Sequence, residues 1–390
     1  MEPLWLNPSR LSPGHVALRD SVRRFVAAEL EPHAAAWDEA GEFPRELYQR
    51  AARAGLFGLR LPEEFGGVPD ADYMHSLVIG VELAQCGSGG LLASLMSHAI
   101  AAPPIAALGS AELQRRTLPR VLAGEWIAAL AITEPSGGSD VAALRTVARR
   151  EGDHYVVDGE KTFITSGMRA DVYTVAVRTD PEAQGAGGIS LLLIERDTPG
   201  FTRTSLAKMG WWASDTAHLR FDGARVPVAN RLGEEGAGFR AIMQNFTGER
   251  FSMAAFALGF AWVCYCEALA WAQQRKTFGQ RLVDHQVVRH RFIDMLAQIE
   301  ATRALLEDVA WRLDHAGAAS PAVVAAVCMA KNTATRTMQF CADAAVQTLG
   351  GMGYMRGSKS ERIYREVKVN MIGGGAEEIM KDLAARQLAL

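Results

Sequence analysis

One acidic residue, Glu249, stands in a stretch that otherwise reads as a long apolar helix, Phe239 to Gln273. Apolar surroundings raise the pKa of a carboxyl group, which suits it to act as a general base near neutral pH. A second unusual feature is the glycine triplet Gly373, Gly374 and Gly375 near the C-terminus. Considered together with this triplet, Glu249 is the candidate catalytic base.

Other interpretations of the carboxylates stay open at this point. Taken alone, Glu249 is equally typical of a solvated residue or of an ion-pair partner for Arg250 or Arg240. Glu377 and Glu378 are rivals for the base, but carboxylates at that position are typical of the first turn of a helix, where they complement its dipole.

A loop with ligand-binding character lies between Ala131 and Val141, where the chain reads AITEPSGGSDV. We expect a strand to end at Thr133, because a proline two residues later blocks its continuation, and the glycines let the loop approach a ligand closely. A serine at Ser139 in this loop is also typical of a helix or turn cap. Glu134 is expected to be structural.

The elements that must position these residues fall into three segments. Apolar residues recur at spacings of three and four up to about Gly124, which predicts helices over Val16 to Ala36, Pro44 to Ala54, Tyr73 to Cys86, Gly90 to Leu108 and Ala111 to Ala123. Short β-rich runs follow, and they predict strands over Trp126 to Thr133, Tyr155 to Ile164, Val172 to Arg178, Ile189 to Glu195 and His218 to Phe221. A hairpin loop is expected over Asp180 to Gly188.

Long helices return in the last segment and should form an antiparallel bundle that buries their apolar stripes. They are expected over Phe239 to Gln273, Gln286 to Ala316, Pro321 to Thr348, Arg362 to Val369 and Glu377 to Leu388. We therefore predict an α+β protein with an N-terminal helical domain (1–125), a central β domain (126–238) and a C-terminal four-helix bundle (239–390).

Composition limits the class of protein. The 390 residues exceed one ordinary core, and 49% apolar residues, 22% charged residues and a net charge of -3 are typical of a globular protein without affinity for nucleic acid or an anionic membrane. No uncharged apolar run of membrane-spanning length stands out, and Met1 to Trp5 lack the basic start of a signal peptide. The expected location is the cytoplasm.

Cysteines and histidines give no metal signal. The five cysteines are odd in number and lack CxxC spacing, so we expect buried free thiols at Cys86, Cys264, Cys266, Cys328 and Cys341. The nine histidines do not pair with cysteines or carboxylates at metal spacing, and His290 is expected on a solvated helix face. No metal site is predicted.

Across nearly its whole length the chain resembles the acyl-CoA dehydrogenase family. The resemblance begins in the loop AITEPSGGSDV and continues in the family's order through GEKTFITSG (159–167), KMGW (208–211) with ASDT (213–216), RVP (225–227), RKTFGQ (275–280), HQ (285–286), QTLGGMGY (347–354) and 362–368. Each motif alone is weak, whereas so many in order are specific. The family's fold has a β-barrel-like central domain between its two helical domains.

The resemblance implies FAD as the cofactor. Ile132 and Thr133 match positions at the flavin pyrimidine edge, and Thr165 matches one that offers a hydroxyl near flavin N5. Phe163 stands where the family usually has a tryptophan that packs on the flavin, which puts cofactor affinity and redox tuning in doubt. The alternative for Phe163 is ordinary strand core.

A second set of positions matches segments that, in this family, reach the FAD of a neighbouring subunit or border the site. The set comprises Arg275, Thr277, Phe278, Gln286, Gln347, Gly350, Gly351, Ala376 and Glu378. An arginine fork suits a pyrophosphate, and glycines admit the backbone to the adenosine portion. A shared site implies at least a dimer, and a homotetramer by analogy. The alternative for Arg275 to Gln280 is a polar helix C-cap with Gly279 at C′.

The implied reaction is α,β-dehydrogenation of an acyl-CoA thioester. A base removes a Cα proton while a hydride leaves Cβ for flavin N5, and hydrogen bonds stabilise charge on the thioester oxygen. Ser139, Arg250, Gly374 and Gly375 match the positions around the thioester.

The base of many members is a glutamate before the last helix, at the position that Gly374 occupies here. A second group, similar to isovaleryl-CoA and long-chain acyl-CoA dehydrogenases, carries its glutamate on the long helix just before an arginine, which matches Glu249 and Arg250. Loss of one carboxylate and gain of the other are mutually consistent, so Glu249 is assigned as the base.

Two other functions stay open. A flavin oxidase or monooxygenase on the same fold would let reduced flavin react with oxygen, and a non-catalytic acyl-CoA binding protein would need no base. We expect a dehydrogenase that passes electrons to an electron-transfer flavoprotein. The acyl chain length and branching are not indicated by the sequence.

Overall fold

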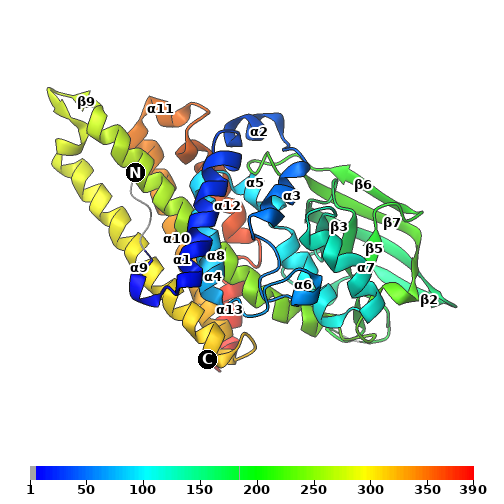
Figure 1. Cartoon of the computed structure of the whole chain (residues 1–390). Coiled ribbons are helices and arrows are strands. Elements are labelled where there is room, and N and C mark those ends of the chain that lie inside the picture. Colours follow the sequence, from blue (N-terminus) through cyan, green and yellow to red (C-terminus); the bar gives the residue numbers. More distant parts are fainter. Residues whose placement is uncertain (1–5, 184) are drawn as a thin grey trace.

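The structure is a computed structural model that describes residues 6–183 and 185–390. Helices, then strands, then long helices succeed one another along the chain, and the strands of the central segment lie at one end of the molecule (Figure 1). This order confirms the predicted fold class. Residues 1–5, which carried the expectation about a signal peptide, lie outside the described residues.

Seven helices form the N-terminal segment: α1 (Pro13–Phe25), α2 (Ala34–Ala40), α3 (Glu46–Arg53), α4 (Tyr73–Leu83), α5 (Gly89–Leu95), α6 (His98–Leu108) and α7 (Ala111–Leu122). Two expected helices are broken. The helix expected over Val16 to Ala36 is interrupted by a π-helical turn at Val26–Leu30 before α2 begins. Pro32, which follows this turn, cannot donate a helical hydrogen bond. The run to Leu108 is two helices, and Pro103 and Pro104 lie inside the second.

The central segment is an eight-stranded mixed sheet. Its strands are β1 (Ala128–Ala131), β2 (Val147–Glu151), β3 (His154–Thr165), β4 (Val172–Arg178), β5 (Ile189–Glu195), β6 (Phe201–Ser205), β7 (Thr216–Pro227) and β8 (Arg231–Leu232). The strand order is β6-β7-β3-β2-β4-β5-β8, and β1 pairs with β4. The sequence missed β2, β6 and β8, because β2 and β6 are largely polar and β8 has only two residues.

Strands β4 and β5 are buried along almost their whole length, as their continuous apolar sequence predicts. They pair antiparallel, with Val172 opposite Glu195 and Arg178 opposite Ile189. The predicted loop between Asp180 and Gly188 therefore joins a hairpin, as expected; residue 184 in this loop lies outside the described residues.

The last segment contains α8 (Gly238–Gln274), α9 (Gln286–Ala316), α10 (Pro321–Leu349), α11 (Gly351–Tyr354), α12 (Lys359–Ile372) and α13 (Glu377–Gln387). A small hairpin of β9 (Lys276–Thr277) and β10 (Gln280–Arg281) separates α8 from α9. Helix α10 packs against α8, α9, α12 and α13, so the bundle is centred on α10 (Figure 1).

Two apolar segments, Gly89–Leu108 and Gly238–Gln274, are long and hydrophobic enough to cross a membrane by composition alone. Their most apolar windows are 56% and 61% buried inside the structure. Packing within the fold therefore accounts for their apolar character. The five cysteines are buried and free, as predicted.

Helices α4 and α8 approach closely, and glycines permit this contact. A Cβ atom on Gly80 would lie 2.5 Å from Cβ of Ala255, and one on Gly259 would lie 2.6 Å from Cβ of Ala84 and 2.8 Å from the Val81 carbonyl oxygen. These distances are too short for carbon contacts, so the crossing of α4 over α8 requires both glycines.

Gly259→Ala should therefore destabilise the protein by about 1–3 kcal/mol through overpacking and lower its thermal midpoint by several degrees. The matched control is Gly248→Ala on the same helix, where an added Cβ finds its nearest neighbour at an ordinary 3.6 Å. That control should be neutral or stabilising, since alanine is the better helix former. Equal thermal midpoints for the two variants would show that the crossing tolerates a larger residue.

Candidate active site

Glu249 lies on α8, beside the end of α12 and the start of α13. Its side chain is partly buried, and the carboxylate oxygen Oε2 is buried and has no hydrogen-bond partner among the described residues. Burial raises the pKa of Glu249 to about 7, against the opposing effect of the positive charges of Arg250 and Lys331. The site thus holds an unpartnered carboxylate that gains and loses a proton near neutral pH.

The glycine loop that follows α12 requires glycine at two positions. Gly374 and Gly375 adopt φ of 65° and 112°, in the region that glycine favours. A Cβ atom on Gly374 would lie 2.8 Å from Sδ of Met253, one helical turn beyond Glu249 on α8. The loop therefore presents bare backbone to the site, and a side chain at 374 would displace Met253.

Arg250 holds this loop. Its Nε donates a hydrogen bond to the Gly374 carbonyl oxygen at 2.8 Å, and its guanidinium lies 5.4 Å from the ring centre of Phe246. The predicted group of Glu249, Arg250, Gly374 and Gly375 is thus brought together by α8 and the glycine loop.

The sequence analysis missed a fifth member, Lys331 on α10. This lysine is fully buried, and its Nζ donates a hydrogen bond to the Gly375 carbonyl oxygen at 2.6 Å. Its neighbour Asn332 donates to the Glu377 carbonyl oxygen at 3.0 Å. A single lysine after the apolar run 322–330 was the available signal.

The rival carboxylates have other partners. Glu377 accepts hydrogen bonds from Arg336 and from Lys381, and these partners, Arg336 first, lower its pKa to about 2. A carboxylate with so low a pKa is a poor base at neutral pH. Glu378 is exposed on the first turn of α13, as expected for an N-terminal carboxylate.

Glu134 has the structural role that the sequence predicted. Its buried carboxylate accepts hydrogen bonds from Lys161 at 2.8 Å and from the backbone N–H groups of Arg145 and Thr146 at 2.6 and 2.8 Å. Lys161 also donates to the Ile132 carbonyl oxygen at 3.0 Å. The ion pair thereby fixes the turn that follows β1.

The first set of predicted cofactor positions is brought together at the ends of β1 and β3. The Thr162 N–H donates to the Thr133 carbonyl oxygen at 2.8 Å, so Ile132 and Thr133 lie beside the segment that contains Phe163 and Thr165. Phe163 interrupts the pairing of β3 with β7, has a φ of 61° and is 70% exposed. The alternative of ordinary strand core is therefore wrong, and the ring is free to contact a ligand.

Ser139 is exposed in the loop after β1. The short helix Val141–Ala143 takes Asp140 at its N-cap, so Ser139 does not cap it. This leaves the serine hydroxyl available for a ligand.

The second set of positions lies elsewhere. Arg275 ends α8, and Thr277 and Phe278 belong to the β9–β10 hairpin, at whose tip Phe278 is 98% exposed. Gly279 lies in the hairpin turn, so the helix C-cap interpretation is wrong. The hairpin and β3 lie at opposite ends of the molecule (Figure 1). Four more positions of this set are exposed at or just after the ends of α9 and α10: Gln286, Gln347, Gly350 and Gly351. Ala376 and Glu378 lie apart from these, at the start of α13.

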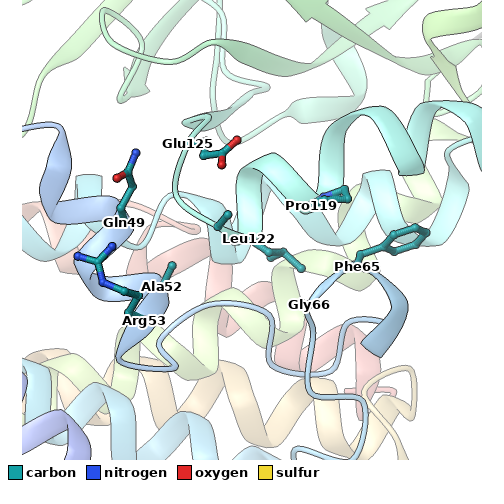
Figure 2. Close-up of a pocket in the computed structure, with 9 residues that line it drawn as sticks. Gln49, Ala52, Arg53, Phe65, Gly66, Pro119, Leu122 and Glu125 are labelled. Carbon is teal, nitrogen blue, oxygen red and sulfur yellow. The ribbon is translucent and has the colours of Figure 1, made fainter.

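Two other features lie apart from this site. A hollow of about 460 Å³ near α3 and α7 is lined by Gln49, Arg53, Phe65, Leu122 and Glu125 among others (Figure 2). It contains none of the predicted site residues and no paired acid and base.

His15, Asp72 and His75 place three ligand-type atoms within 4.8 Å of one another. However, the Ser12 N–H donates to Nδ1 of His15, so a neutral ring carries its proton on Nε2, which faces Asp72 at 2.9 Å. Capping of α1 and α4 explains this cluster without a metal ion. His290 is exposed on α9, as predicted.

Comparison with known proteins decides the family. The chain matches the acyl-CoA dehydrogenase N-terminal domain over residues 12–125, the middle domain over 129–224 and the C-terminal domain over 236–389. It is 37% identical to the mitochondrial long-chain specific acyl-CoA dehydrogenase of Sus scrofa, over 97% of this chain and 87% of that protein. The chain belongs to the acyl-CoA dehydrogenase family. The enzyme is therefore an oxidoreductase and a flavoprotein.

Solved structures agree with this assignment. A putative acyl-CoA dehydrogenase from Mycobacterium smegmatis superposes with a TM-score of 0.93 at 44% identity, over 97% of this chain and 98% of that one. A glutaryl-CoA dehydrogenase from the same organism, in complex with FADH2, superposes with a TM-score of 0.90 at 26% identity, over 98% and 96% of the two chains. Members of the family depend on FAD, as predicted.

The residues present fit a flavin. The exposed ring of Phe163 offers a stacking surface, and Thr133 and Thr165 bring hydroxyl groups to the same edge of the sheet. When bound, FAD supplies the acceptor for a hydride. The protein supplies orientation and the proton acceptor.

The pH dependence of catalysis should report the raised pKa of Glu249. Because the base acts when deprotonated, kcat/KM should rise as the pH increases through about 7 and level off roughly one unit higher. The measurement is the pH–rate profile of the FAD-loaded enzyme, with FAD content followed over the same range as a control. A profile that is already flat above about pH 5.5, as for an ordinary glutamate, would contradict the assignment.

Proposed function

We propose that this acyl-CoA dehydrogenase uses Glu249 as its catalytic base and converts an acyl-CoA thioester to the 2-enoyl-CoA. One observation carries the proposal: a buried carboxylate oxygen of Glu249 has no hydrogen-bond partner among the described residues, while the adjacent Arg250 bonds the glycine loop instead. Of the other carboxylates considered, Glu134 and Glu377 are held in ion pairs and Glu378 is exposed.

The proposed reaction follows from the chemistry of this group. Oε2 of Glu249 accepts the proton from Cα, and a bound flavin would accept the hydride from Cβ at N5. Backbone N–H groups of the glycine loop donate to the thioester oxygen, where negative charge develops. Arg250 contributes by fixing the Gly374 carbonyl and keeping the loop in place. Ser139, in the loop after β1, is exposed and available to contact the thioester.

We infer that the FAD site is shared between two copies of the chain. Within one copy, strand β3, which contains Phe163 and Thr165, lies far from the β9–β10 hairpin (Figure 1). The ring of Phe278 in this hairpin is almost completely exposed. A second copy would bring Arg275, Thr277, Phe278, Gln286, Gln347, Gly350 and Gly351 to the adenosine part of the cofactor. Ala376 and Glu378, at the start of α13, are proposed as further cofactor contacts. A homotetramer, as a dimer of such dimers, rests on the family resemblance.

We also propose a class of acyl chain, an electron acceptor and a cellular location. A base on α8 and a glycine at 374 are compatible with long or branched acyl chains, because the loop side of the site has no side chain at that position. An electron-transfer flavoprotein is the proposed electron acceptor. Composition alone supports a cytoplasmic location without binding to membranes or nucleic acid.

The test is anaerobic reduction of the flavin by short, long and branched acyl-CoA thioesters, compared between the natural enzyme and Glu249→Gln. The amide keeps the shape of the side chain but cannot accept the proton, so flavin bleaching should slow by about 10²–10⁴ or more. FAD content and thioester affinity should be retained.

Glu377→Gln is the matched control, since it makes the same change at the rival carboxylate. It should bleach at a rate close to that of the natural enzyme. Near-normal bleaching by Glu249→Gln, or severe loss in Glu377→Gln alone, would reject Glu249 as the base.

A further inference from the structure

Three side chains from two helices hold three carbonyl groups, two in the glycine loop and one at the first residue of α13. Arg250 of α8 bonds the carbonyl of Gly374 at 2.8 Å. Lys331 and Asn332 of α10 bond the carbonyls of Gly375 and Glu377 at 2.6 and 3.0 Å. The loop between α12 and α13 is therefore fixed at three points by elements that also surround Glu249.

These bonds determine where the backbone donors of the loop point. In a trans peptide the carbonyl and the following N–H point in opposite directions. Holding the carbonyls of Gly374 and Gly375 therefore aims the N–H groups of residues 375 and 376 away from Arg250 and Lys331. Without such bonds, two consecutive glycines would sample many conformations.

Fixing the loop does not by itself require a lysine. Asn332 performs the same task at Glu377 with a neutral amide, whereas burying an ammonium group is unfavourable. Lys331 is fully buried and has no carboxylate within 4 Å among the described residues; its hydrogen bond is to a carbonyl. A neutral donor would serve the backbone equally well, so the charge needs another explanation.

The charged and titratable groups around Lys331 supply that explanation. They are Arg250 and Glu249 from α8, Cys328 from α10 and Glu377 from α13. Burial, and then repulsion by Arg250, lower the pKa of Lys331 to about 8, so the lysine still carries most of its charge at pH 7. Glu377 is neutralised by Arg336 and Lys381, and the buried Cys328 thiol has a raised pKa. Glu249 is the carboxylate left without a hydrogen-bonded cation.

We propose that Lys331 is a positioning residue of the active site: it fixes the glycine loop through Gly375 and supplies positive charge that favours the ionised form of Glu249. This inference rests on the proposed role of Glu249. Lys331 touches neither substrate nor cofactor in this account and acts through its two neighbours.

The experiment compares Lys331→Gln, which keeps a donor but loses the charge, with Lys331→Met, which loses both. Removing a nearby positive charge makes a carboxylate harder to ionise, so both variants should move the acidic limb of the kcat/KM profile to higher pH by roughly half a unit or more. Lys331→Gln should recover most of its lost rate when the pH is raised, whereas Lys331→Met should stay several-fold slower because the loop is also released.

Lys381→Gln is the charge-matched control. It removes one positive charge from an exposed position on α13, where solvent screens it, and should leave the profile in place. FAD content and thermal midpoint establish that each variant is folded.

The proposal would be overturned if Lys331→Gln lowered kcat/KM by the same factor at every pH and left the acidic limb of the profile in place. Loss of structure alone lowers the rate in this way without changing the pH dependence. Failure of Lys331→Gln to fold or to retain FAD would overturn it as well, since the charge would then serve folding. These outcomes are distinct from failure of the proposed function, which would appear as near-normal flavin bleaching in Glu249→Gln.

Discussion

A carboxylate that must remain unpartnered inside a protein is the constraint on which this site depends. Raising the pKa of Glu249 to about 7 means that its ionised form is disfavoured on the order of 3 kcal/mol relative to water. An ion pair would remove that penalty and also remove the basicity. The structure instead places the cations Arg250 and Lys331 on the neighbouring backbone carbonyls, so their charge lies near Glu249 while their hydrogen bonds go to the loop.

The same constraint explains the glycines. Gly374 has a left-handed conformation and lies against Met253, which follows Glu249 by one turn of α8. A carboxylate on position 374 would have to displace Met253 and strain the backbone. In this chain, therefore, the base belongs on α8, and the loop contributes backbone groups. The Glu134–Lys161 pair shows the opposite case, where a buried carboxylate with a full set of partners serves as a support for the strand end that carries Thr133.

Much of this was accessible from the sequence, for identifiable reasons. The long helices α8, α9 and α10 and the hairpin β4–β5 have strong apolar periodicity or continuous apolar runs, and their predicted limits agree with the structure within one residue. Strands β2 and β6 escaped prediction because both are largely polar and mostly exposed, so neither carries an apolar pattern. The break near Leu30 precedes Pro32, and nothing in the apolar pattern marks the end of α5 at Leu95.

The site residues likewise divide into those that the sequence predicts and those that it does not. Glu249 was found because a charged residue stands out in an apolar helix. Gly374 was found because many members of the family carry a glutamate at its position. Lys331 was missed, because a lone lysine on a helix is normally exposed, and only the tertiary structure reveals that it reaches the loop before α13. The separation of Phe163 from Phe278 was likewise invisible to spacing along the chain.

The most direct measurement of the central claim is exchange of the thioester Cα hydrogen with deuterium oxide, followed by mass spectrometry on a bound acyl-CoA analogue that cannot be oxidised. This isolates proton removal from hydride transfer and from the electron acceptor. The account predicts rapid exchange with the natural enzyme and exchange at the uncatalysed rate with Glu249→Gln, at equal occupancy of the analogue. Exchange at the natural rate in Glu249→Gln would show that another group removes the proton.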